Sequence, residues 1–86
     1  MKTQIYSIFD TCAAVYLKPI FARTDGEIMR QFTDMCCDKT HPCGQHPEHY
    51  QLFRLASFDD LTGEVDNQEN TCLARGHEVV ALAEGE

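Results

Sequence analysis

The chain has 86 residues, of which 43% are hydrophobic and 24% are charged, with a net charge of −7 and five cysteines. A chain this short folds as one domain around a modest core, because burying about 60–65% of its unfolded surface leaves little stability in reserve. We therefore expect a single domain over residues 1–86 and favour a homo-oligomer, which would add stability. The longest apolar runs are far shorter than the about 20 residues of a membrane-spanning helix, so we expect no membrane segment.

The charge and the cysteines limit the partners and the compartment. The negative balance argues against non-specific binding to nucleic acid, which needs clustered cations. The number of cysteines is odd, and the N-terminal segment MKTQIYSIFD lacks the apolar stretch of a signal peptide. Reduced thiols in a cytoplasmic setting are the simplest account of both observations.

The first quarter of the chain predicts two extended segments. Thr3 to Asp10 alternates loosely and is rich in residues that favour strands. Asp10 and Thr11 then favour a turn. The segment from Tyr16 to Arg23 contains Pro19, which excludes a central strand position and suits an edge strand or an irregular extended segment.

A helix is predicted next, from Thr24 to Cys37. Its start is a capping box, in which Thr24 accepts a hydrogen bond from a first-turn N–H and Glu27 reaches back to the capping residue. The apolar residues that follow have the spacing of one buried helical stripe. They are Ile28, Met29, Phe32, Met35 and Cys36.

The nine residues from Tyr50 to Phe58 are rich in aromatic and aliphatic side chains and predict a strand. Asp59 and Gly63 favour a chain reversal into a second strand, Glu64 to Asn67. A strand with apolar side chains on both faces is best buried on two sides, so we place the first of these strands inside the sheet. Strict alternation puts Tyr50, Leu52, Ala56 and Phe58 on one face and Phe53 and Leu55 on the other.

The end of the chain supports two interpretations. A broken helix over Thr71 to Leu82 and a short strand over His77 to Leu82 both fit, and Gly76 weakens either one. We expect a frayed acidic tail over Ala83 to Glu86, and hence a core over about residues 3–67 with an uncertain tail segment over 68–86. The expected fold is α+β, a small and mostly antiparallel sheet with one amphipathic helix packed on one face. A ferredoxin-like variant is the nearest named topology.

The segment from Asp38 to His49 predicts a loop, because its prolines and glycine prevent continuation of the helix. The loop and the helix end hold thiols and imidazoles, the ligand types of zinc, at Cys36, Cys37, His41, Cys43, His46 and His49. Their spacing matches no recognised zinc finger and includes no CxxC pair, which favours a packed cysteine and solvated histidines. We expect no metal and no cofactor. If a metal binds, the candidates are Cys37, His41, Cys43 and His46.

No motif predicts an enzyme. Cys43 with His41 or His46 would supply a thiol and a base, but closeness in sequence does not establish catalytic geometry. Asp59 and Asp60 fit hairpin-turn chemistry better than a catalytic carboxylate pair. The sequence contains no glycine-rich phosphate loop, no GxSxG and no HExxH.

Aromatic side chains offer a different kind of site, a platform on a sheet face on which bases stack. Most rings must belong to the core of so small a domain. We expect one or two of them to be exposed, from among Tyr6, Tyr16 and Tyr50, whose hydroxyls tolerate water.

Several segments together resemble a known family. They are QIYSIFDTCAAVYLKPIFAR near the start, MRQFTD in the helix, GEVD after the reversal and, most specifically, HP-x-x-Y-x-L-F-x-x-x-S-F-D-x-x-T-G from His46 to Gly63. Over roughly residues 3–67 the chain resembles the small nonstructural protein, encoded by the fifth reading frame, of gokushovirus-type microviruses. These are phages with circular single-stranded DNA. The cysteine-rich helix end and loop depart from the family pattern, and the family has no established catalytic residues to carry over.

The resemblance implies a non-enzymatic accessory protein in the host cytoplasm, absent from the mature virion, that serves single-stranded DNA synthesis or genome packaging. It would bind single-stranded DNA directly, or bind a phage replication or procapsid protein. The alternative is an acidic interaction module that binds a host factor without contacting nucleic acid. The residues expected to contact DNA are Tyr16, Lys18, Arg23, Arg30 and Arg54.

Overall fold

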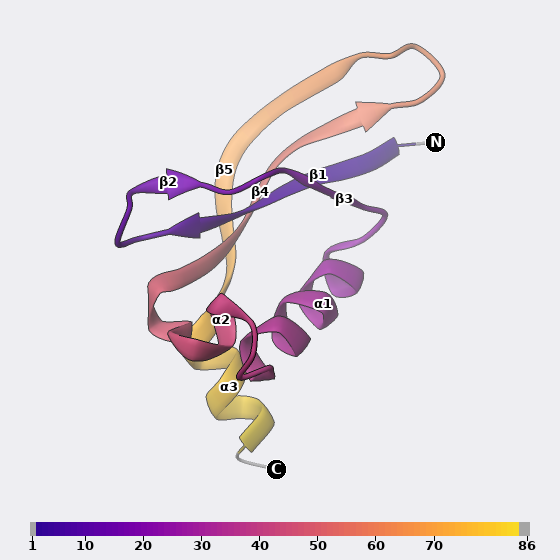
Figure 1. Cartoon of the computed structure of the whole chain (residues 1–86). Helices are drawn as coiled ribbons and strands as arrows, with labels where there is room; N and C mark the ends of the chain where they lie inside the picture. Colours follow the sequence, from indigo (N-terminus) through magenta and orange to yellow (C-terminus); the bar gives the residue numbers. More distant parts are fainter. Residues whose placement is uncertain (1, 85–86) are drawn as a thin grey trace.

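The structure is a computed structural model that describes residues 2–84. All strand pairs are antiparallel and form one sheet, in which β1 lies between β4 on one side and the short strands β2 and β3 on the other, with β5 beyond β4 (Figure 1). The expected α+β fold with a mostly antiparallel sheet is confirmed. The elements are β1 (Lys2–Asp10), β2 (Val15–Tyr16), β3 (Ile20–Ala22), α1 (Asp25–Cys37), α2 (Pro42–Gln45), the 3₁₀ helix η1 (Pro47–His49), β4 (Tyr50–Asp59), β5 (Val65–Arg75) and α3 (Gly76–Glu84).

The extended segment around Pro19 is an interrupted edge of the sheet. Pro19 separates β2 from β3, and both strands pair with β1. This matches the expectation, because proline has no N–H to donate to a continuous ladder. The turn before β2 is held by the carboxylate of Asp10, which accepts the backbone N–H groups of Cys12 and Ala13 at 3.0 and 3.3 Å.

Helix α1 begins and ends where the sequence predicts. The Thr24 side chain accepts the N–H of Glu27 at 3.2 Å, as in a capping box. The Glu27 carboxylate accepts the backbone N–H of Arg23 at 3.4 Å instead of that of the capping residue. The helix buries Ile28, Phe32 and Cys36.

Strand β4 lies inside the sheet as expected, but the predicted assignment of its faces is wrong. Ile5 pairs with Ala56, whereas the next residue, Tyr6, pairs with Arg54, so Leu55 is an extra residue on β4. A bulge of one residue moves the side chains beyond it to the opposite face. Leu52 therefore faces the helices, whereas Ala56 and Phe58 share the other face of the sheet.

The end of the chain is regular structure and contributes to the core. Gly63 has a φ of 75° and starts the reversal, after which β5 continues to Arg75, well beyond the predicted Asn67. The chain then enters α3 at Gly76, where an added Cβ would lie 2.2 Å from the carbonyl oxygen of Pro47. The buried core therefore extends past the expected range of 3–67. Ala83 and Glu84 belong to α3, and residues 85–86 lie outside the described part of the chain.

The core lies between one face of the sheet and the helices. Its sheet side chains are Tyr6, Ile8, Ala22, Leu52 and Ala74, and its helical side chains are Ile28, Phe32, Cys36, Cys43 and Val79. All three α-helices contribute to this one core, so within residues 2–84 the opposite face of the sheet carries no helix. The structure adds α2 and α3 to the single expected helix. The order of elements also differs from the β-α-β-β-α-β order of a ferredoxin-like fold, because three strands precede α1.

Candidate interaction surface

The face of the sheet opposite the helices carries five of the chain's eight Phe and Tyr side chains. We call it the open face. It follows β1 over the seven residues from Thr3 to Phe9, which corresponds to about 20 Å. Most of the aromatic rings of this small domain are therefore outside its core. The register places Ile5, Ser7, Phe9, Tyr16, Phe21, Phe53, Ala56 and Phe58 on this face.

The aromatic rings form two groups along the open face. Near β2, the ring centroid of Phe9 lies 4.7 Å from that of Tyr16 and 6.1 Å from that of Phe53, and the centroids of Tyr16 and Phe53 are 5.7 Å apart. Near β3, the centroids of Phe21 and Phe58 are 6.4 Å apart. Most of these contacts are edge to face, a favourable arrangement for aromatic pairs.

Two of these rings are largely exposed. Phe21 is 57% exposed and Tyr16 43% exposed, and Val65, which pairs with Phe58 across β4 and β5, is 54% exposed. Tyr16 was expected to be exposed, and this is confirmed. Tyr6 was also a candidate, and that expectation is wrong because its ring is fully buried beneath α1.

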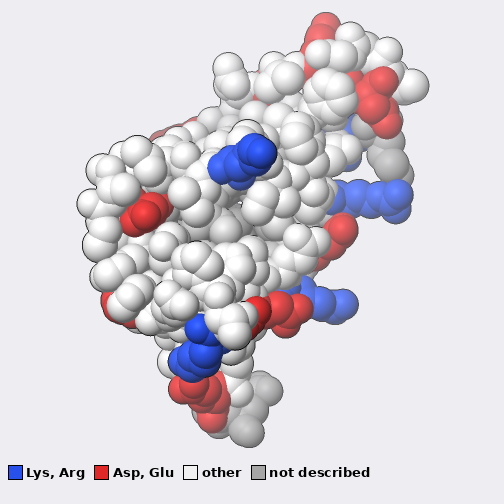
Figure 2. All heavy atoms as spheres, viewed as in Figure 1, with Lys and Arg blue, Asp and Glu red and all other residues white. Residues whose placement is uncertain are grey.

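Charged groups are scarce on the open face. On β1 to β4 the side chains of this face include no ionisable group except the Tyr16 phenol, and Ser7 donates its hydroxyl to the carbonyl of Leu17 at 2.6 Å. On β5 the register adds Cys72 and Arg75 to the same face. In Figure 2 most charged side chains lie towards the right and lower margins of the view, while one basic side chain projects from its upper middle and one acidic side chain lies on its left. An acidic chain thus presents an apolar strip with little charge.

A polar bulge of β5 reaches towards one end of this strip. Between Arg54 and Ala56 of β4 the partners on β5 jump from Thr71 to Asn67, so residues 68–70 protrude from the ladder. The side-chain amide of Asn70 donates to the phenol oxygen of Tyr16 at 3.2 Å, which joins the two outer edges of the sheet. The bulge therefore contacts the ring group near β2 through Tyr16.

The predicted DNA-contacting residues do not form one strip. Tyr16, Lys18 and Arg23 lie along the edge formed by β2 and β3, and Lys18 and Arg23 are exposed. Arg30 is exposed on α1. Arg54 lies on the helix side of the sheet, since it pairs with buried Tyr6 and contacts α1. The structure thus brings three of the five residues to one edge and places the other two elsewhere.

Arg54 has a structural partner beneath α1. Its guanidinium donates to one carboxylate oxygen of Asp25 at 2.5 Å, and the phenol of Tyr6 donates to the other at 2.6 Å. Burial, reinforced by the hydrogen bond to Asp25, raises the pKa of Tyr6 well above its usual range. This group of three ties β1 and β4 to the first turn of α1, which accounts for Arg54 without a ligand.

The four residues considered for a metal do not converge. Cys43 is buried in the core, Cys37 is exposed, and the His41 ring accepts the backbone N–H of Cys43 at 3.1 Å. A hydrogen bond with Cys43, together with burial, raises the pKa of Cys36 and keeps that thiol neutral. Of the four, only His46 belongs to a group of metal-ligating side chains that converge within residues 2–84.

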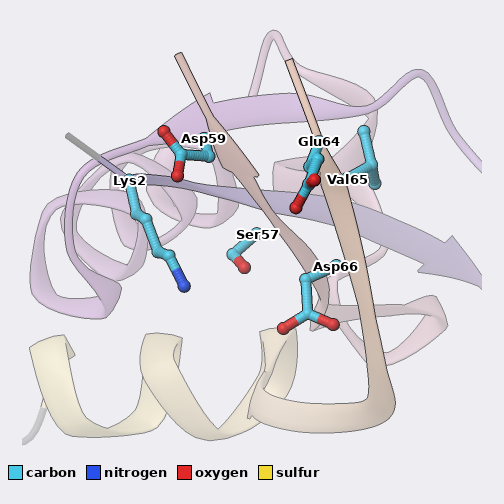
Figure 3. Close-up of a pocket in the computed structure, with 6 residues that line it drawn as sticks. All are labelled: Lys2, Ser57, Asp59, Glu64, Val65 and Asp66. Atoms are coloured by element: carbon cyan, nitrogen blue, oxygen red, sulfur yellow. The ribbon is translucent and has the colours of Figure 1, made fainter. Parts of the chain in front are cut away.

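An acidic hollow of about 190 Å³ lies on the helix side of the sheet, at the β4–β5 hairpin. Figure 3 shows its lining residues. Asp59 also accepts the backbone N–H of Leu61 at 3.0 Å, as expected for a turn aspartate. The hollow places carboxylates on the side away from the aromatic rings. It is lined by Lys2, Ser57, Asp59, Glu64, Val65 and Asp66.

Comparison of the sequence with known protein families assigns the chain to one of them. The family model described as Phage ORF5 protein matches residues 3–79, which include all of the strands except the first residue of β1, and the start of α3. The chain belongs to the phage ORF5 protein family. No curated protein and no solved structure matches it. For this ORF5 protein the match supports the bacteriophage origin and the general class of phage protein that the HPxxY segment implies.

The sequence of this ORF5 protein predicted only some of the aromatic rings that lie on its open face. Tyr16 follows from the expectation that tyrosines tolerate exposure. Phe58 was missed because strict alternation along β4 ignores the extra residue at Leu55. Phe21 is exposed while the next residue, Ala22, is buried, and the sequence of this short segment does not indicate which of the two faces the core. To assign such rings to a face, one must know where the strand pairing shifts by one residue, and a single sequence does not reveal this.

Proposed function

We propose that this ORF5 protein is a non-enzymatic accessory protein of a gokushovirus-type microvirus, and that it binds a phage replication or procapsid protein through the open face. It would act in the host cytoplasm during single-stranded DNA synthesis or genome packaging and be absent from the mature virion. One observation carries the proposal: an acidic chain leaves a row of aromatic side chains without a covering helix, on a face to which β1 to β4 contribute no charged side chain.

The chemistry of the open face suits a protein partner. Centres of protein interfaces are depleted in charged groups and enriched in aromatic side chains, and a few such rings supply most of the binding energy. Phe21, which is 57% exposed and contacts Phe58, is the ring most available to enter a pocket of the partner. The carboxylates at the hairpin hollow lie on the other side of the sheet and would not be buried by the contact.

The test measures binding of the purified chain to the replication initiator and to the major capsid protein of the same phage, by biolayer interferometry. Phe21→Ser should weaken binding at least about tenfold, since an exposed aromatic anchor contributes about 2 kcal/mol or more. Leu61→Ser is the matched control, because Leu61 is 85% exposed at the hairpin tip, away from the open face. Absence of binding at tens of micromolar, or equal loss in both variants, would refute the proposal.

Direct contact with single-stranded DNA is the second candidate, favoured by Lys18 and Arg23 on the same edge as Tyr16 and Phe21. Bases stack on exposed rings for about 1–3 kcal/mol each. With two cations available, log K should fall with log salt at a slope no steeper than about −1.4. Fluorescence anisotropy with an oligothymidine at two salt concentrations measures this, with Arg30→Ala as the control that should change nothing.

The two candidates give different results. Binding to the oligonucleotide that Lys18→Ala weakens and Arg30→Ala does not would assign the open face to DNA. Binding to a phage protein without DNA binding would assign it to the protein. The same samples also test the expected homo-oligomer: if the wild type is a dimer and Phe21→Ser a monomer by light scattering, a second copy covers this face and the first proposal is wrong.

A further inference from the structure

Two histidines and a glutamate converge at η1, outside the open face. The nitrogen Nδ1 of His46 lies 3.8 Å from Oε1 of Glu48, and Nε2 of His49 lies 3.7 Å from the same oxygen. The two imidazole rings are stacked, with centroids 5.2 Å apart and planes inclined by 20°. The three potential ligand atoms all lie within 4.8 Å of one another. Nothing in the open face or in the proposed function uses this group.

We propose that His46, Glu48 and His49 form a binding site for a divalent transition-metal ion of the zinc class. Imidazole and carboxylate are ligands that zinc accepts, at about 2.0–2.2 Å. In a tetrahedron with such bonds, neighbouring ligand atoms are about 3.3–3.5 Å apart. The two distances to Glu48 exceed this by a few tenths of an ångström, and all three ligand atoms lie within 4.8 Å of one another, so rotation of the exposed side chains would bring them onto one ion.

The backbone that carries the three ligands is held in place from several directions. The N–H of His46 donates to Pro42 at 3.2 Å, and that of His49 donates to His46 at 3.0 Å. The carbonyl of His49 accepts both the backbone N–H and the hydroxyl of Thr11 at 2.9 Å. Gly76 packs directly against Pro47, where a side chain would clash. The ligands therefore start from an ordered backbone, which lowers the cost of organising the site.

The side chains themselves are accessible. The exposed fractions are 62% for the side chain of His46, 56% for Glu48 and 37% for His49, so an ion can reach them from solvent. The overall charge of −7 favours the approach of a cation. Three protein ligands leave a fourth position for water or for a side chain of another molecule. The sequence suggested no metal and, if any, a set with Cys37, His41 and Cys43, and the structure assigns different partners to His46.

The test is a titration of the reduced, metal-free chain with zinc, followed by calorimetry and by NMR of the histidine side chains. One ion should bind per chain, and the imidazole signals of His46 and His49 should shift while that of His77 does not. His46→Gln combined with His49→Gln should abolish binding, and Glu48→Gln should weaken it at least about tenfold. His77→Gln, an exposed histidine on α3, is the matched control and should bind as the wild type does.

Exposed thiols are the main competitors for zinc, and Cys37, the one nearest to the site in the sequence, is tested in the same way. Cys37→Ser should leave the affinity unchanged, since Cys37 is not part of the site. Binding that survives the double histidine variant, or that is lost in Cys37→Ser, would refute the proposal. Circular dichroism establishes that each variant is folded, and stabilisation of the wild type by zinc, absent from the double variant, gives a second readout of the same site.

Discussion

Tyr6 shows how one side chain can be both core and polar anchor. Its ring is fully buried among apolar groups, while its hydroxyl donates to Asp25, which Arg54 also binds. Desolvating a phenol is acceptable when the hydroxyl keeps a strong acceptor, and a carboxylate is such an acceptor. The same arrangement makes ionisation of the phenol unfavourable in the folded state.

This raised pKa predicts a loss of stability in alkali. Above about pH 10 the unfolded chain releases the Tyr6 proton and the folded chain keeps it. The unfolded state then binds fewer protons, so the free energy of unfolding falls as pH rises, by up to about 1.4 kcal/mol per pH unit from this group. Urea denaturation at pH 7, 10 and 11 measures the effect.

Tyr6→Phe is the variant that isolates this effect. It should cost about 1 kcal/mol at pH 7, where the hydrogen bond to Asp25 is lost. Its stability should then fall less steeply than that of the wild type between pH 10 and 11. An alkaline loss of equal size in the two proteins would show that other groups are responsible.

At the scale of elements, α3 is the part that sequence reasoning described least well. Gly76 was taken as a weakness in either a helix or a strand, whereas it is the point at which β5 ends and α3 begins against Pro47. Val79 then enters the core beside residues of α1 and the sheet. The reason for this glycine is a contact with a segment about thirty residues earlier, which local propensity does not include.

The helix gives a prediction with an internal control. Val79→Ala should lower the free energy of unfolding by about 1–2 kcal/mol, because the side chain is buried and its removal leaves unfilled space. Leu82→Ala, in the same helix but with Leu82 73% exposed, should change it by less than about 0.5 kcal/mol. Chemical denaturation of the two variants compares them, and similar effects would mean that α3 is not docked as described.

Other elements were predictable because their causes are local. The Thr24 cap and the apolar spacing define α1, Pro19 divides an edge strand, and the turn between Asp59 and Gly63 needs a residue with positive φ. The candidate site was predicted less completely. Arg54 and Tyr16 were expected on one strip, and they face opposite sides of the sheet because the strand register decides which way each side chain points.

At the scale of the whole molecule, the excess of carboxylates sets how stability responds to salt. Groups of like charge repel one another in the compact state, and added salt screens that repulsion. Raising sodium chloride from about 20 to 200 mM shortens the screening length from about 20 to 7 Å, so the melting temperature should rise by a few degrees. Differential scanning calorimetry measures it, and a lower melting temperature in salt would mean that ion pairs such as Arg54–Asp25 outweigh the repulsion.

The reversal between β4 and β5 also matters for work with the protein. Residues 60–64 are exposed, and Figure 1 places this end of the hairpin far from the helices. Chain tips of this kind accept added sequence with little effect on the fold. An epitope or fluorescent label spliced between Leu61 and Thr62 would report on the protein in infected cells while leaving both its aromatic side and its histidine corner free to engage whatever they bind.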